Sequence, residues 1–205
     1  MHGRYPIPAA VRRVEQSIKR SRFIATAAHA PDADAARAFI DAVRAEFPDA
    51  THNCWAYAAG PPGDTAAVGL SDDGEPHGTA GKPMLAALLH GPVGEIAVVV
   101  TRYFGGVKLG TGGLVRAYTQ LVNAALETLE TREKIDLATL VTVLPYPAVT
   151  PFKRLLPDFE AAIISETYAE SAAFTVELPE EHAEAFAERL AEITDGKAMV
   201  AATGE

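Results

Sequence analysis

One window of the chain runs from an apolar stretch through glycines into an amphipathic pattern. The run "EIAVVVT", Glu95 to Thr101, is continuous and β-branched, which predicts a buried strand. From Leu114 the apolar residues recur at helical spacing and predict a long amphipathic helix. The glycines between them, which begin at Gly105, predict a loop. Any fold of this chain must therefore connect a strand to a helix through one glycine-rich loop.

This glycine-rich loop is a candidate phosphate site. Unpaired backbone N–H groups at a helix start, together with the helix dipole, favour an anion, and glycines let the anion approach the backbone closely. Basic side chains can add charge-assisted hydrogen bonds to a phosphate. The alternative is that the glycines only supply positive φ in a tight connection. The candidate phosphate- or RNA-binding residues of this window are Arg102, Lys108, Gly110, Gly112, Gly113 and Arg116.

The known nucleotide-binding motifs do not match this window. Gly105 and Gly110 have the glycine spacing of a P-loop, but Thr111 and Gly112 follow where Lys and Ser or Thr are needed. A dinucleotide motif that begins at Gly110 would need its third glycine at Val115. The sequence therefore does not predict a classical ATP, GTP or NAD site, and we expect no cofactor.

A second informative segment is "SDDGEPHGTAGKP", Ser71 to Pro83. Its glycine-rich end again leads into a predicted helix, which adds Thr79 and Lys82 to the candidate phosphate-binding residues. A second candidate cluster consists of residue types that bind metals or act as general acids and bases; its members are His52, Asp72, Asp73, Glu75 and His77. The spacing matches neither a calcium loop nor a zinc-type helix pair, so no metal ligand is assigned. The alternative is a turn of solvated carboxylates.

Cys54 and Trp55 can each be interpreted as functional or as packed residues. His52 and Cys54 are two apart on a predicted strand and share a face, which would permit a thiol–imidazole pair, although a packed Cys54 is the more ordinary interpretation. Trp55 faces oppositely and fits either a core or a base-stacking surface.

The rest of the first 134 residues also mixes strands and helices. The predicted elements are a first strand at 17–28, a helix at 32–47 with Asp32 or Asp34 as N-cap, a hairpin formed by 52–60 and 64–71, and a short helix at 83–90. After Lys134 the pattern restarts as strand, helix, two strands, helix and strand, at 138–144, 149–156, 161–168, 172–178, 180–193 and near Ala198. That βαββαβ order is ferredoxin-like. With "TREKID", Thr131 to Asp136, as linker, we predict an α+β protein with domains at 1–134 and 135–205.

The charge is distributed unevenly between these two domains. The formal net charge is −9, yet residues 1–134 hold equal numbers of basic and acidic residues, 14 of each. Residues 135–205 hold 4 basic and 13 acidic residues. We therefore expect any polyanion to bind the first domain, and the acidic second domain to meet a protein partner or to serve as a spacer.

The apolar runs and the single cysteine indicate the cellular compartment in which we expect the protein. No run approaches the roughly 20 apolar residues of a membrane helix, and no signal-peptide pattern follows the first basic residues. Cys54 has no second cysteine with which to form a disulfide. We expect a cytoplasmic protein with no membrane partner.

Three segments together resemble a known family. "HNCWAY", "SDDGEPHGTAGKPML" and "VTRYFGGVKLGTGGLVRAY" are similar to the hallmark segments of the IMPACT family, in particular of its bacterial YigZ branch, and occur in order with suitable spacing. The likeness extends to "KRSRFIA" and to the βαββαβ region. It implies a first domain with the two-layer fold of the second domain of small-subunit ribosomal protein five, including a left-handed βαβ crossover. It also implies a second domain that resembles a C-terminal domain of elongation factor G.

The resemblance and the basic glycine loop together suggest a function. We expect a translation-associated regulator that binds RNA or ribosomes through the glycine-rich basic surface, with no catalytic residue. The rival hypothesis is a metal-dependent hydrolase or phosphoryl-handling enzyme with its centre at Asp72 to His77.

Overall fold

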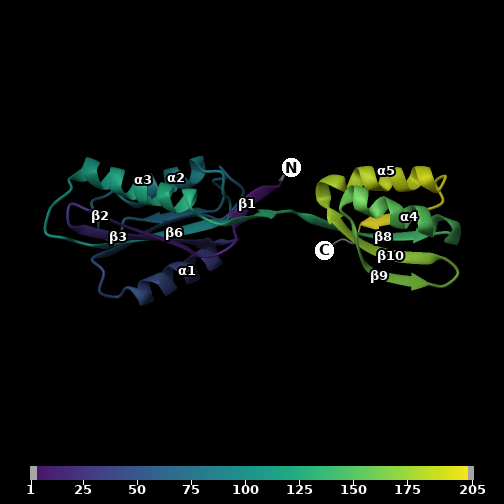
Figure 1. Cartoon of the computed structure of the whole chain (residues 1–205), viewed down its shortest axis with the longest axis horizontal. Coiled ribbons are helices and arrows are strands. Elements are labelled where there is room, and N and C mark those ends of the chain that lie inside the picture. The colour runs from purple at the N-terminus through teal and green to yellow at the C-terminus, as the bar shows by residue number, and fades with distance from the viewer. Residues whose placement is uncertain (1–3, 203–205) are drawn as a thin grey trace. The chain divides into compact units, whose positions relative to one another are not determined.

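The computed structural model describes residues 4–202, which form two compact units (Figure 1). One unit is Tyr5–Lys134. Of the described residues, Arg4 and 135–202 make up the other unit. None of the helices within the described range is both long enough and apolar enough to cross a membrane.

The Tyr5–Lys134 unit is built on a five-stranded antiparallel sheet. The strand order is β2-β3-β6-β4-β5, and a separate two-stranded sheet pairs β1 with β7. The elements are β1 (Tyr5–Pro8), β2 (Arg12–Ile18), β3 (Ser21–His29), α1 (Ala33–Glu46), β4 (His52–Ala58), β5 (Val68–Ser71), α2 (Gly81–His90), β6 (Ile96–Tyr103), α3 (Thr111–Glu127) and β7 (Thr131–Lys134).

Helices cover both faces of this sheet. Successive residues of β6 point to opposite faces, so Val98 and Val100 pack in one core with α2 and α3, whereas Ala97 and Val99 pack in another with α1. Figure 1 shows α2 and α3 on one side of the sheet and α1 on the other. The expected two-layer arrangement is therefore wrong in one respect, because α1 adds a third layer.

Two crossover connections pass over opposite faces of the sheet. β3 and β4 run parallel on either side of β6 and are joined through α1, while β5 and β6 run parallel on either side of β4 and are joined through α2. The β5–α2–β6 connection differs from the β3–α1–β4 connection in three ways. Its strands run in the opposite direction, it crosses the sheet in the opposite direction, and its helix covers the opposite face. Three reversals invert the hand, so one of the two crossovers is left-handed, whereas nearly all such connections are right-handed. The topology thus contains the left-handed crossover that the family resemblance implies.

Several predicted elements of this unit are confirmed and two are corrected. Asp32 caps α1, its side chain accepting from the Ala35 N–H, and β4 and β5 form the predicted hairpin. The single strand expected at 17–28 is wrong, because the chain reverses at Lys19 and Arg20 (φ 45° and 68°) and β2 pairs with β3. Most of the expected linker at Thr131 to Asp136 is strand β7, whose Lys134 pairs with Tyr5.

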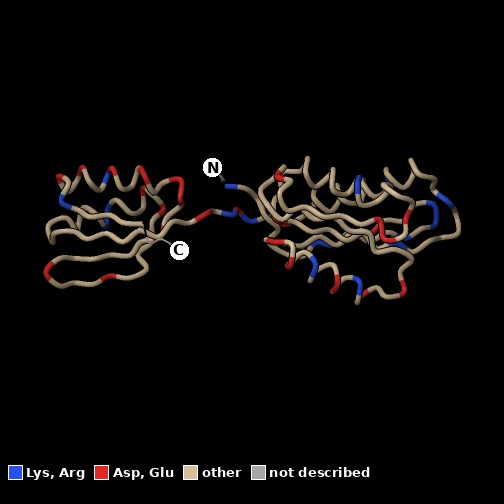
Figure 2. Tube along the Cα trace, turned by 180° about the vertical axis from the view of Figure 1, so that it is seen from behind, with Lys and Arg blue, Asp and Glu red and all other residues tan. Residues whose placement is uncertain are grey.

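The second unit confirms the predicted βαββαβ order. Its antiparallel sheet has the strand order β11-β8-β10-β9, and the rings of Phe152, Phe174 and Phe186 meet in its core. Glu184, Glu188 and Glu192 recur every four residues along α5, with Arg189 between the last two (Figure 2). The elements are β8 (Leu137–Leu144), α4 (Val149–Leu155), β9 (Ala162–Tyr168), β10 (Ala172–Pro179), α5 (Ala183–Ile193) and β11 (Met199–Ala202), with short 3-10 turns at Tyr146–Ala148, Leu156–Phe159 and Glu180–His182.

A buried carboxylate fastens the β1–β7 ribbon to the main sheet. Glu95 accepts hydrogen bonds from the Tyr5 hydroxyl (3.0 Å) and from the Lys134 ammonium, and it lies 2.7 Å from His29 Nε2. Burial raises the pKa of Glu95, but Lys134, His29 and Tyr5 lower it by more, so the net pKa lies below its ordinary value. The ionised carboxylate is therefore the form that stabilises this corner of the unit.

Replacing Glu95 with glutamine tests that role. We expect Glu95→Gln to lower the free energy of unfolding by about 2 kcal/mol at neutral pH, because the ionised acceptor of Tyr5 and Lys134 is lost. Since the folded-state pKa is depressed, the wild type loses this stabilisation as the pH falls below the ordinary value of 4.5 and through the folded pKa. Urea unfolding should show the difference between variant and wild type shrink on acidification. The exposed Glu130→Gln is the control, and a difference that grows with acidity would contradict the assignment.

Candidate functional site

The start of α2 is occupied by a carboxylate of the chain itself. Asp72 accepts the backbone N–H groups of Gly78 (2.7 Å), Ala80 (3.0 Å) and Gly81 (2.9 Å). Burial raises the pKa of Asp72, but these N–H groups and His77 lower it by more, so the net pKa lies below its ordinary value. A helix start that already holds an anion differs from the open phosphate site predicted there.

The other predicted residues near the start of α2 differ in their exposure to solvent. Thr79 is buried and its hydroxyl donates to the Pro76 carbonyl (2.6 Å), whereas Lys82 is exposed. His77 is fully exposed, with Nδ1 3.7 Å from the Asp72 carboxylate. Thr79 and Lys82 therefore do not converge on a common open site.

Asp73 and His52 attach the same loop to β4. The Asp73 carboxylate accepts the Asn53 N–H (2.6 Å) and the Arg44 guanidinium (2.9 Å). His52 Nδ1 lies 2.8 Å from the Asp73 carbonyl oxygen, and because a carbonyl only accepts, this nitrogen carries the proton. Asp73 adopts φ 42° and Gly74 φ 86°, which turns the loop sharply over His52.

Glu75 and Arg102 form a buried ion pair that joins the two candidate regions. Arg102 Nη1 donates to Glu75 Oε1 at 2.5 Å, and the two residues are 4% and 8% exposed, Arg102 being the less exposed. The hydroxyl of Tyr118, on α3, donates to the same oxygen at 2.8 Å, and Arg102 Nη2 donates to Ser21 Oγ at 3.2 Å. The guanidinium also lies over the Phe23 ring, 5.2 Å from its centroid. The structure thus places Arg102 in the interior and not among exposed phosphate ligands.

Cys54 contacts Tyr118, which donates to the carboxylate of the same buried pair. Its sulfur is 3.3 Å from the Tyr118 hydroxyl and 2.9 Å from the Asp72 carbonyl. Burial raises the pKa of Cys54, the Tyr118 contact lowers it and the nearby Glu75 charge raises it, so that the net pKa is about 12. The thiol is therefore protonated and packed, in agreement with the alternative to a reactive pair. Trp55, on the opposite face, packs against the α1 core and stacks on Tyr57 at 6.0 Å.

The predicted residues of the glycine loop and the start of α3 are largely exposed. Gly110 is the N-cap of α3 with φ 75°, and no side chain caps that end. Gly112 and Gly113 follow in the first turn, and a Cβ at Gly110 or Gly112 would meet no atom within 4 Å. Lys108 and Arg116 lie on either side of these glycines and are exposed. The start of α3 is thus exposed, and phosphate binding by its glycines, Lys108 and Arg116 stays a prediction.

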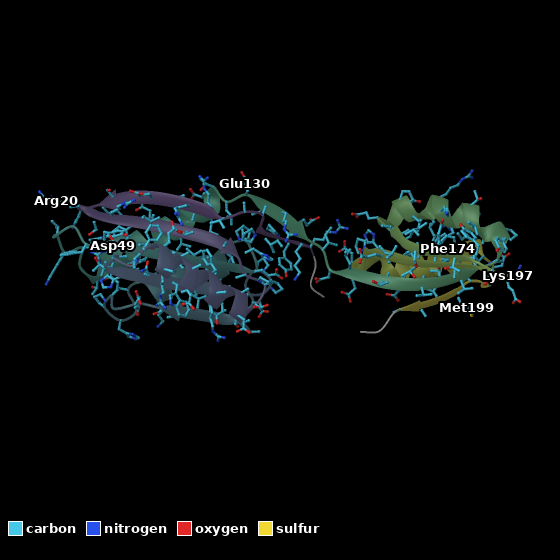
Figure 3. All side chains as sticks on the ribbon, turned by 90° about the horizontal axis from the view of Figure 1, so that it is seen from below. Arg20, Asp49, Glu130, Phe174, Lys197 and Met199 are labelled. Atoms are coloured by element: carbon cyan, nitrogen blue, oxygen red, sulfur yellow. The ribbon has the colours of Figure 1, made fainter. Side chains whose placement is uncertain are left out.

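The β2–β3 turn adds two cations that the sequence interpretation missed. A Cβ at Gly105 would lie 1.9 Å from the Arg20 carbonyl oxygen, so this turn packs directly on the loop. Arg20 lies at the end of the unit (Figure 3). The sequence signal for this turn is the adjacent pair Lys19 and Arg20 between two strand-like runs. The prediction of a single strand across both runs hides this turn.

These cations form one surface, which we name the basic tip: Lys19, Arg20, the loop Phe104–Gly110 with Lys108, and Arg116. Gln120, one helical turn after Arg116, donates to Gln16 of β2 (3.1 Å), which places Arg116 on the side of α3 that faces β2. Figure 2 shows basic residues gathered at this end of the unit. Within residues 4–202, none of the four cations makes an ion pair. In that same range, no group of three or more His, Cys, Asp or Glu is arranged to hold a metal ion.

Two family descriptions match the chain. Residues 19–126 match the Impact N-terminal domain, and residues 142–197 match a domain of unknown function, DUF1949. The Escherichia coli protein called IMPACT family member YigZ is 46% identical over 199 residues, which cover 97% of this chain and 98% of that one. The chain belongs to the IMPACT family.

Two solved structures are similar. A crystal structure of a hypothetical protein matches with a TM-score of 0.70 and 44% identity, over the full length of both chains. A crystal structure of a protein from Thermus thermophilus matches with a TM-score of 0.51 and 9% identity, over 99% of this chain and 29% of that one. The second likeness concerns the fold alone.

A double-mutant cycle tests whether Arg102 is a structural residue. We expect Arg102→Met to lower the free energy of unfolding by about 3 to 5 kcal/mol, because the Glu75 carboxylate stays buried without its cation. Glu75→Gln should also destabilise, and the double variant should cost less than the two single changes added together, since it leaves no unpaired charge. Urea unfolding of the four proteins measures this coupling. An Arg102→Met protein as stable as the wild type would show that the ion pair does not support the fold.

Proposed function

We propose that this IMPACT-family chain is a cytoplasmic, translation-associated regulator that binds RNA, free or within a ribosome, through the basic tip. The observation that carries the proposal is a set of four exposed cations, without ion pairs in the described residues, on the β2–β3 turn, on the glycine-rich loop that it packs against and near the start of α3. The cations are Lys19, Arg20, Lys108 and Arg116.

The helix start itself supports phosphate binding. The first backbone hydrogen bond into α3 runs from the Leu114 N–H to the Gly110 carbonyl, so the N–H groups of residues 111–113 precede the helical ladder. A Cβ at Gly110 or Gly112 would meet no described atom within 4 Å, so this side of the helix start is open to a bulky anion, whereas a Cβ at Gly113 would lie 3.1 Å from the Leu109 side chain. A phosphate there would receive backbone N–H groups, the helix dipole and nearby cations together.

The rest of the charge distribution restricts nucleic acid to this end. The chain carries a formal net charge of −9, so a polyanion is repelled at long range and attracted only where cations gather. The acidic C-terminal unit is an unfavourable surface for RNA, and a protein partner for it remains our prediction.

We do not propose the rival metal-dependent hydrolase at Asp72 to His77. Asp72 uses both carboxylate oxygens on backbone N–H groups, and Asp73 uses both of its oxygens on Asn53 and Arg44. The oxygen of Glu75 that faces Arg102 also accepts from Tyr118. These acceptors hold the loop in place, and a metal would have to displace those contacts.

RNA binding at several salt concentrations tests the proposal. We expect the affinity for a labelled short RNA, measured by fluorescence anisotropy, to fall with a slope of about −3 in log K against log salt if all four cations contact phosphates. The variant Lys19→Ala/Arg20→Ala/Lys108→Ala/Arg116→Ala should lose most of this binding and of its salt dependence while keeping the thermal stability of the wild type.

The matched control removes exposed cations elsewhere. Lys82→Ala and Arg132→Ala lie in the same unit outside the basic tip and should leave binding nearly unchanged. Arg102 stays intact in every variant, since its loss would damage the fold. A wild type that binds neither free RNA nor ribosomes would refute the proposal.

A further inference from the structure

A phenylalanine is exposed in the middle of the basic tip. Phe104 directly follows β6, is 46% exposed and lies on the loop that also carries Lys108. Its ring lies against the buried guanidinium of Arg102, whose central carbon is 5.5 Å from the ring centroid. The ring therefore rests on a buried cation and still presents nearly half of its surface to solvent.

The backbone on both sides of this ring is held by hydrogen bonds. The Phe104 N–H donates to Thr51 Oγ1 (3.0 Å), and the Gly105 N–H donates to Ser21 Oγ (3.3 Å). Ser21 Oγ also accepts from Arg102, which is fixed in turn by Glu75. The exposed ring is therefore pre-organised, and a ligand that stacks on it loses little affinity to ordering it. The unconstrained part of the loop begins only at Gly106, with φ 82° and open space around it.

A fixed exposed aromatic ring among cations that form no ion pair with any described residue has the composition of a single-strand nucleic-acid site. Bases stack on aromatic side chains while cations follow the phosphates. Inside a duplex the base faces are covered by neighbouring base pairs, so away from the duplex ends only an unpaired base can stack on the ring. Resting on the proposed function, we propose that Phe104 is a stacking platform for an unpaired base and that the basic tip therefore selects single-stranded RNA.

Two variants separate stacking from other roles of Phe104. Phe104→Leu keeps an apolar cover over Arg102 but removes the aromatic face, whereas Phe104→Trp keeps that face. The control is Tyr146→Ala, an aromatic residue of similar exposure (49%) in the other unit. Thermal unfolding confirms that each variant is folded before its binding is measured.

The probe is a short RNA that contains one 2-aminopurine, used both as a single strand and in a duplex. We expect the wild type to bind the single strand more tightly and to quench the 2-aminopurine, whose fluorescence falls on stacking. Phe104→Leu should weaken single-strand binding by about 5- to 100-fold and abolish the quenching, with duplex binding unchanged. Phe104→Trp and Tyr146→Ala should retain both binding and quenching.

Failure of this inference can be told apart from failure of the proposed function. Equal binding of single strand and duplex, or unchanged single-strand binding by Phe104→Leu, would overturn the stacking platform. The proposed function would survive that result, provided that binding is still lost in the Lys19, Arg20, Lys108 and Arg116 variant. A wild type that binds no form of RNA would overturn both.

Discussion

The buried ion pair of Arg102 and Glu75 is the interaction on which the candidate site depends. Burying two charges is costly unless their hydrogen-bonding groups are satisfied. Tyr118 and Ser21 supply partners and two aromatic rings flank the guanidinium, while Arg102 Nε is buried without a hydrogen-bond partner among the described residues. The pair links residues 27 apart in sequence, one on a loop and one on the central strand β6. Because Phe104 and Gly105 follow Arg102 closely, the position of the exposed loop is set by a carboxylate inside the unit.

The two glycine-rich helix starts look alike in sequence but differ in the folded chain. Asp72 precedes α2 closely enough for its carboxylate to accept the N–H groups of Gly78, Ala80 and Gly81. The segment 104–110 before α3 contains no acidic residue, and no side chain within residues 4–202 caps that helix start. The chain itself thus distinguishes a structural helix terminus from one that is open to solvent.

Much of the fold follows from local sequence patterns, whereas the direction of individual side chains does not. The amphipathic repeats and the Asp32 cap predict the helices, and the βαββαβ order follows from the alternation of strand and helix patterns. Whether Arg102 faces solvent or the core depends on its partner Glu75, a long-range contact that no local pattern contains. The turn at Lys19 and Arg20 was concealed because both of its flanks have the pattern of one strand. The basic tip could therefore be predicted only in part, through Lys108, Arg116 and the glycines.

The β1–β7 ribbon joins the two ends of the Tyr5–Lys134 unit. Tyr5, where the chain enters the unit, pairs with Lys134, where it leaves, so the two points of attachment lie side by side. Figure 1 shows β1 at the end of the unit away from the loop between β6 and α3. The chain therefore enters and leaves this unit at one place, which is the arrangement expected of a unit that can be inserted into another protein.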